Sequence, residues 1–218
     1  MLALKQRCLW ILAMLTLAVA PAWAGPEDEL KSYVDNSTQK LVDKLNAEKS
    51  LYSEDPEAFY KLMEETLDQF VDFRRIAARV MGRYARQTTP EQRDEFVERF
   101  KRSLFDAYAQ ALVNADDFEM TVQDAEILPN NSDRASVQMQ LTSASGNRIP
   151  ITYSMFKNSE DRWMMENLIV EGVNIGLAFR DRFSQEMEQN RGQIQLVIDG
   201  WGSAVESLDL NNEEQGQS

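Results

Sequence analysis

Residues 135–165 read ASVQMQLTSASGNRIPITYSMFKNSEDRWMM, and this stretch decides the fold. Apolar and polar residues alternate over 135–142 and again over 149–155, which is the period of strands that bury one face. Short polar turns separate these segments from each other and from a third strand around Trp163. An earlier alternating segment begins at Met120. Strands joined by such short turns indicate an antiparallel meander with one covered face.

Helical periodicity governs the sequence on either side of these strands. Thr89-Pro90-Glu91-Gln92 is a capping box with proline in the first helical position, which is a specific signal for a helix start. Asp55-Pro56 opens another helix in a similar way. Helices packed on an antiparallel sheet predict a single α+β domain. We expect helices over residues 27–48, 55–70, 72–81, 89–113, 174–187 and 193–205.

The first 24 residues are typical of a cleaved export signal. Lys5 and Arg7 precede an apolar run of 12 residues, and Ala22-Trp23-Ala24 fits a small-residue cleavage site. The run is shorter than the roughly 20 apolar residues of a transmembrane helix, although an uncleaved N-terminal anchor is the alternative. We expect three parts, which are a signal peptide at 1–24, a soluble exported domain at 25–208 and a disordered tail at 209–218.

Composition limits the functions of the exported part. Cleavage leaves 194 residues with 21 basic and 36 acidic side chains, a net charge of −15, which argues against binding nucleic acid or an anionic membrane surface. The exported part has no histidine and no cysteine, because the single cysteine is Cys8. Nucleophilic catalysis and zinc sites that need histidine or cysteine are therefore excluded, as are disulfides. Glu166 and Glu171 have no recognisable catalytic partner, so we expect no enzyme, no cofactor and no metal.

The apolar face of the predicted sheet has two interpretations. It is rich in methionine and aromatic residues, and methionine adapts to irregular or changeable contents. The same pattern also describes an ordinary packed core. Periodicity does not distinguish a filled cone of helices and strands from a hollow one.

Several segments resemble, in matching order, the MlaC or toluene-tolerance auxiliary family of periplasmic phospholipid-binding proteins. The similarity spans residues 55–205, and the chain departs from the family pattern at Asn167 and Asn174. The matching segments are VDFRRIA at 71–77, VMGRY at 80–84, TPEQR at 89–93 followed by Phe96, Phe100, Tyr108 and Leu112, and Trp163 through Glu171-Gly172-Val173.

The resemblance implies an NTF2-like cone of helices on a curved antiparallel sheet, enclosing an apolar pocket for acyl chains. It implies a soluble periplasmic carrier of a Gram-negative bacterium, with diacyl glycerophospholipid as cargo and not as a cofactor. Such a carrier shuttles lipid between an outer-membrane lipoprotein–porin complex and an inner-membrane ABC transporter complex, which maintains outer-membrane lipid asymmetry and solvent tolerance. A shuttle that docks at two places suggests a monomer. The alternative is a periplasmic peptide-binding or holdase module with a filled core and no lipid cargo.

An acyl chain in transit must be covered along its length, because each exposed methylene costs about 0.8 kcal/mol. The inward face of the meander, its continuation past Gly172 and the facing helices therefore form the predicted lining. The predicted lipid-binding residues are Val80, Met81, Phe100, Leu104, Tyr108, Val137, Met139, Leu141, Ile149, Ile151, Tyr153, Met155, Trp163, Met165, Val173 and Ile175.

Five arginines between residues 74 and 86 form a positive cluster in an acidic chain. Arg75, Arg79 and Arg83 share one face at helical spacing, where they would meet a lipid headgroup or an acidic surface of a docking partner. The alternative is a solvated face that balances nearby acidic side chains.

Overall fold

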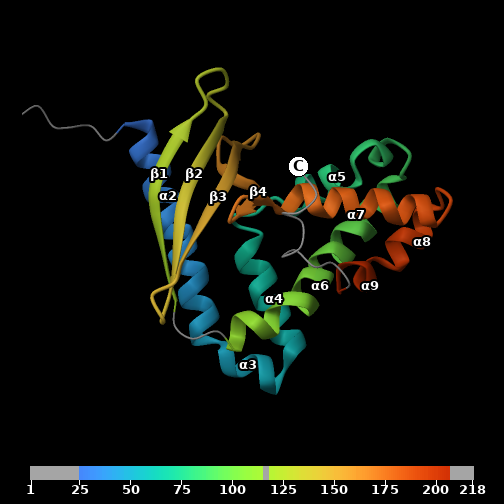
Figure 1. The fold of residues 1–218 in the computed structure, drawn as a ribbon, viewed down its shortest axis with the longest axis horizontal. Helices are drawn as coiled ribbons and strands as arrows, with labels where there is room; N and C mark the ends of the chain where they lie inside the picture. The colour runs from blue at the N-terminus through green and yellow to red at the C-terminus, as the bar shows by residue number, and fades with distance from the viewer. Residues whose placement is uncertain (1–24, 115–117, 207–218) are drawn as a thin grey trace, which may run out of the picture.

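The structure is a computed structural model that describes residues 25–114 and 118–206. The predicted signal peptide and the predicted tail lie outside the described residues. Residues 25–114 are mainly helical (Figure 1) and comprise α2 (Pro26–Ala47), α3 (Lys49–Glu54), α4 (Pro56–Leu67), α5 (Phe73–Met81), the 3-10 helix η1 (Gly82–Arg86) and α6 (Pro90–Asn114).

A five-stranded antiparallel meander follows, with its strands in sequence order, and three helices complete the described chain. The predicted α+β class is thereby confirmed. The strands are β1 (Phe118–Ile127), β2 (Arg134–Ser143), β3 (Arg148–Lys157), β4 (Trp163–Val170) and β5 (Val173–Asn174), and the last helices are α7 (Ile175–Gln189), α8 (Ile194–Asp199) and α9 (Trp201–Glu206).

The predicted helix starts are confirmed by their hydrogen bonds. The backbone N–H of Gln92 donates to Thr89 Oγ1 over 3.2 Å, and the Thr89 N–H donates to Gln92 Oε1 over 3.1 Å, which completes the capping box of α6. The Asp55 carboxylate likewise accepts from the Ala58 N–H over 3.0 Å at the start of α4.

Three details of the secondary structure differ from the sequence-based expectation. Helix α3 was not predicted. The predicted helix over 193–205 is two short helices that meet at Gly200. The break at Glu171-Gly172 is a tight turn, in which both residues have positive φ angles of 51° and 88°, and the chain then pairs back on β4 as β5.

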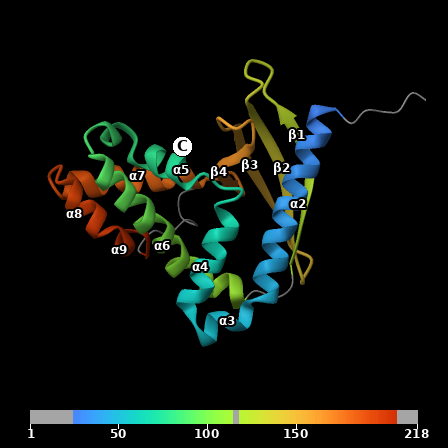
Figure 2. The ribbon, with the colours of Figure 1, turned by 180° about the vertical axis from the view of Figure 1, so that it is seen from behind.

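Helix α2 covers one face of the sheet (Figures 1 and 2) and fills it. Leu30 and Val34 of α2 are fully buried in one cluster with inward-facing strand residues such as Val137 and Met155. Phe70 completes this sheet core, because its ring lies 5.9 Å from the ring of Tyr153. The predicted alternation of strand burial is confirmed along β2. The covered face was expected to line a pocket, whereas in the structure it packs against α2.

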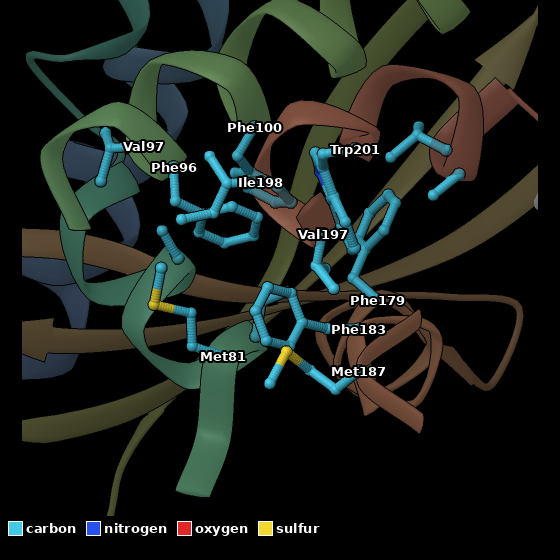
Figure 3. Packing of buried hydrophobic residues seen from close by; sticks show 14 residues of the cluster. Met81, Phe96, Val97, Phe100, Phe179, Phe183, Met187, Val197, Ile198 and Trp201 are labelled. Atoms are coloured by element: carbon cyan, nitrogen blue, oxygen red, sulfur yellow. The ribbon is translucent and has the colours of Figure 1, made fainter. Parts of the chain in front are cut away.

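A second core holds the helical half together, and it is drawn in Figure 3. Trp201 of α9 is fully buried, and its ring meets Phe96 edge-on with centroids 5.1 Å apart. Phe96 also packs edge-on against Phe183 of α7 at 5.1 Å. This helical core and the sheet core are separate clusters, and α4 stands between the two halves of the molecule (Figure 2).

Candidate ligand-binding cavity

A cavity of about 490 Å³ lies where the two halves meet. Its volume is within the range of about 300 to 1,000 Å³ that is typical of small-molecule sites. Its walls come from the end of α2, from α4, α5, α6 and α7, and from β4. The lining is almost wholly apolar and consists of Leu45, Phe59, Tyr60, Met63, Glu64, Leu67, Val71, Phe73, Ile76, Phe100, Lys101, Leu104, Phe105, Tyr108, Ala109, Met165, Asn167, Leu168, Val170, Ile175, Gly176 and Phe179.

Helical spacing explains how two of these walls form. Phe100, Leu104 and Tyr108 follow each other at four-residue intervals on α6, so their side chains lie in one row. Phe59 and Met63 form the corresponding row on α4. Burial raises the pKa of the Tyr108 phenol, which is therefore neutral at physiological pH and adds no charge to the lining.

A closed hydrogen-bond network joins the middle of β4 to the start of α7 at another wall. Asn167 Oδ1 accepts from the Gly176 N–H over 3.1 Å, and Asn167 Nδ2 donates to Asn174 Oδ1 over 3.1 Å. Asn174 Oδ1 also accepts from the Leu177 N–H over 3.0 Å and so caps α7. The two positions that depart from the family pattern are thus partners in one network.

Lys101 and Glu64 are the charged residues of the lining. The Lys101 ammonium lies 3.0 Å from Glu64 Oε1 and 3.0 Å from Asp68 Oδ2, so these ion pairs join α6 to α4. Burial lowers the pKa of Lys101, but the hydrogen bonds to both carboxylates outweigh it and raise this pKa above its ordinary value. Lys101 is therefore a cation throughout the physiological range.

The structure brings five of the predicted lipid-binding residues to this cavity: Phe100, Leu104, Tyr108, Met165 and Ile175. It does not bring the others there. Val80 and Met81 lie in the helical core, and Val173 is a partly buried residue of β5. The sheet core holds Val137, Met139, Leu141, Ile149, Ile151, Tyr153, Met155 and Trp163.

The predicted location of the cavity is therefore corrected: it lies beside β4, toward one edge of the sheet, and not on the broad face. The reason is the docking of α2, which fills the broad face. Tyr33 of α2 donates a hydrogen bond from its hydroxyl to the Trp163 carbonyl over 2.8 Å, and its ring lies 6.0 Å from that of Phe70. Sequence periodicity showed that α2 has an apolar face but not which surface receives it.

The arginine cluster is also rearranged by the fold. Arg75 and Arg79 both bind Glu166, with Arg79 Nη2 2.9 Å from Glu166 Oε1, and Arg134 of β2 is a third partner. Arg83 does not share their face, because Gly82, with a φ of 53°, ends α5 before it. Arg83 instead donates to the Tyr84 hydroxyl over 2.7 Å.

Some residues of the cavity were missed although a signal was present. Phe59, Met63 and Phe179 lie in predicted helices but are absent from the predicted lining. Lys101 and Glu64 lie 37 residues apart and carry no motif, so nothing in the sequence pointed to their pairing.

Among residues 25–114 and 118–206, no group of acidic side chains is arranged to hold a metal ion. None of the helices within the same ranges combines the length and apolarity that are needed to cross a bilayer.

The fold and the cavity define a class of protein, namely an α+β domain with an apolar binding site between its helices and the end of its sheet. The family model described as MlaC protein matches residues 35–203. The chain therefore belongs to the MlaC family.

Individual relatives agree with this membership. The chain is 34% identical over 206 residues to the toluene tolerance protein ttg2D of Pseudomonas putida, covering 94% of this chain and 93% of the relative. It is 23% identical over 151 residues to the intermembrane phospholipid transport system binding protein MlaC of Haemophilus influenzae, covering 67% and 70%. A solved phospholipid-binding protein from Ralstonia solanacearum, in complex with a phospholipid, has the same fold with a TM-score of 0.70, 18% identity, and coverage of 80% of this chain and 97% of that one.

Proposed function

We propose that this chain is a soluble periplasmic carrier of diacyl glycerophospholipids and not an enzyme. The observation that carries the proposal is the nearly all-apolar cavity of about 490 Å³ between the two halves of the domain. An acyl chain of about 16 carbons costs on the order of 12 kcal/mol in water, so a carrier must cover most of its methylenes. The rows of aromatic and aliphatic side chains on α4 and α6 provide such a cover.

The relatives' names support this proposal. The Haemophilus relative is named for intermembrane phospholipid transport, and the Pseudomonas relative is named for toluene tolerance. We propose the corresponding role here, in which the protein acts as a monomer. It moves lipid between an outer-membrane lipoprotein–porin complex and an inner-membrane ABC transporter complex, and thereby maintains outer-membrane asymmetry.

The proposed docking site for these partner complexes is the arginine cluster, which consists of Arg75 and Arg79 on α5 and of Arg83 on η1, beyond Gly82. Arg75 and Arg79 also hold Glu166, so their reversal would disturb the fold as well as any docking. Arg83 is a cleaner probe, since its contact is with the neighbouring residue Tyr84. If the surface docks, Arg83→Glu slows lipid exchange with partner complexes and leaves uptake from vesicles unchanged; equal exchange rates would remove Arg83 from the docking surface.

Lipid transfer between vesicles tests the carrier function. Leu104 projects into the cavity from α6, so Leu104→Trp should fill part of the cavity and reduce the phospholipid that each protein molecule carries. Leu196→Trp is the matched control, because Leu196 is an exposed residue of α8 outside the lining. Equal transfer by both variants would show that this cavity does not hold the cargo.

A further inference from the structure

The charged residues of the cavity lie together at one place on its wall. Lys101 and Glu64 line the cavity, and Asp68 lies one turn beyond Glu64 on the same side of α4. The exposed fractions of their side chains increase from 11% for Lys101 to 22% for Glu64 and 45% for Asp68. The cluster therefore leads from the apolar interior to solvent, which is the position that a lipid headgroup takes when its acyl chains are inside.

The net charge of this cluster is negative. One ammonium is shared by two carboxylates at 3.0 Å, and a third carboxylate, that of Glu98, lies 4.0 Å from it. The next cation on α6 is Arg102, which does not offset this charge, because it is itself paired with Glu57 at 2.7 Å and Asp106 at 2.8 Å.

The cluster nevertheless keeps a donor for a phosphate. An ammonium has three N–H donors. In the described part of the chain, Lys101 gives two of them to Glu64 and Asp68. Its third donor can bind a phosphodiester oxygen without breaking either ion pair.

From this arrangement we infer that Lys101, Glu64 and Asp68 form a headgroup site that selects a zwitterionic, amine-bearing glycerophospholipid over an anionic one. The inference rests on the proposed carrier function. The phosphate of either lipid meets the Lys101 ammonium. A headgroup amine then places a positive charge beside the two carboxylates. A lipid whose head alcohol is uncharged lacks this amine, so the negative charge of its phosphate is added to an already negative site.

Competitive uptake tests the inference. The mature protein is incubated with vesicles that contain equal amounts of phosphatidylethanolamine and phosphatidylglycerol with identical acyl chains. It is then separated and extracted, and both lipids are counted by mass spectrometry. We expect about fivefold enrichment of the ethanolamine lipid, the effect of one partly exposed ion pair.

Carboxylate-to-amide variants assign the selection to this site. Glu64→Gln combined with Asp68→Asn should bring the lipid ratio close to that of the vesicles, and Asp68→Asn alone, at the more exposed position, should give an intermediate ratio. Glu65→Gln is the matched control: it removes one carboxylate from an exposed position of the same helix, outside the lining, and should keep the native ratio.

The outcomes separate the inference from the carrier function. Two results would overturn the headgroup site alone. In the first, the native protein takes up a normal total amount of lipid in the same ratio as the vesicles. In the second, total uptake is normal and both Asp68→Asn and the double variant keep the native ratio. A native protein that takes up neither lipid would overturn the carrier function, and the inference with it.

Discussion

Glu166 is the residue whose role is least visible in the sequence. Ser154 pairs with Asn167 and Met155 with Met165, so Glu166 is the extra residue of a β-bulge in β4. Its side chain is 1% exposed and is held by Arg75, Arg79 and Arg134. A buried carboxylate with three cationic partners serves structure. Arg75 and Arg79 were predictable as members of a cluster, whereas Arg134 and the common anion were not.

Neutralising this carboxylate should destabilise the protein. Glu166→Gln keeps the shape of the side chain but leaves three guanidinium groups without their counter-charge. We expect a loss of about 2 kcal/mol in the free energy of unfolding, less than for a fully buried pair because the arginines are partly exposed. Urea denaturation measures it, with Glu160→Gln in the exposed pair with Arg162 as the control that should change little. Equal midpoints for the two variants would contradict the structural role of Glu166.

Gly176 tests the network at the β4–α7 wall of the cavity. A Cβ at position 176 would lie 2.3 Å from Asn167 Oδ1, so Gly176→Ala must push the amide away and break the hydrogen bond between them. We expect the free energy of unfolding to decrease by about 2 kcal/mol, because the added methyl group overpacks this site. Gly202→Ala in α9 meets nothing within 4 Å and should be neutral or stabilising, since alanine is the better helix former. Thermal unfolding of both variants measures the difference; a Gly176→Ala protein as stable as the native one would show that Asn167 is free to move.

At the level of elements, local sequence signals were sufficient to predict individual helices and strands. They were not sufficient to predict how these elements pack against one another. Thr89-Pro90-Glu91-Gln92 specified the start of α6, and alternation specified β2 and β3, because caps and pleats depend on neighbouring residues. The placement of α2 depends on contacts such as that of Val34 with residues more than 80 positions away. That placement decides that the sheet face is packed and that the cavity lies beside β4.

The tight packing of the sheet core should affect how the free energy of unfolding changes at alkaline pH. Burial raises the pKa of Tyr153 to about 12. Between its ordinary pKa near 10 and about 12, Tyr153 keeps its proton in the folded state and loses it in the unfolded state. Its contribution to stability is therefore constant below pH 10 and decreases as the pH rises to 12.

Urea denaturation from pH 7 to 12 measures this effect. Tyr153→Phe should reduce the loss of stability between pH 10 and 12 relative to the native protein. Identical pH profiles for the native protein and Tyr153→Phe would mean that the sheet core admits water.

For the whole molecule, the cavity is a consequence of how two separately packed halves meet. The helical core and the sheet core each fill their own interior, and the space between α4, α6, α7 and β4 is left with apolar walls. The sequence predicted the α+β class and the apolar rows of each helix. It could not predict where the cavity lies, because that depends on which apolar faces remain without a partner after the others have docked.

Mass spectrometry of the purified mature protein, first under native conditions and then after solvent extraction, tests the carrier function most directly. We expect diacyl glycerophospholipid at a defined stoichiometry in the native spectrum, and the mass of the polypeptide alone after extraction. A protein that has no bound lipid and also takes none from vesicles would contradict the proposal. The apolar cavity at the junction of the two halves would then serve another ligand, such as an unfolded peptide.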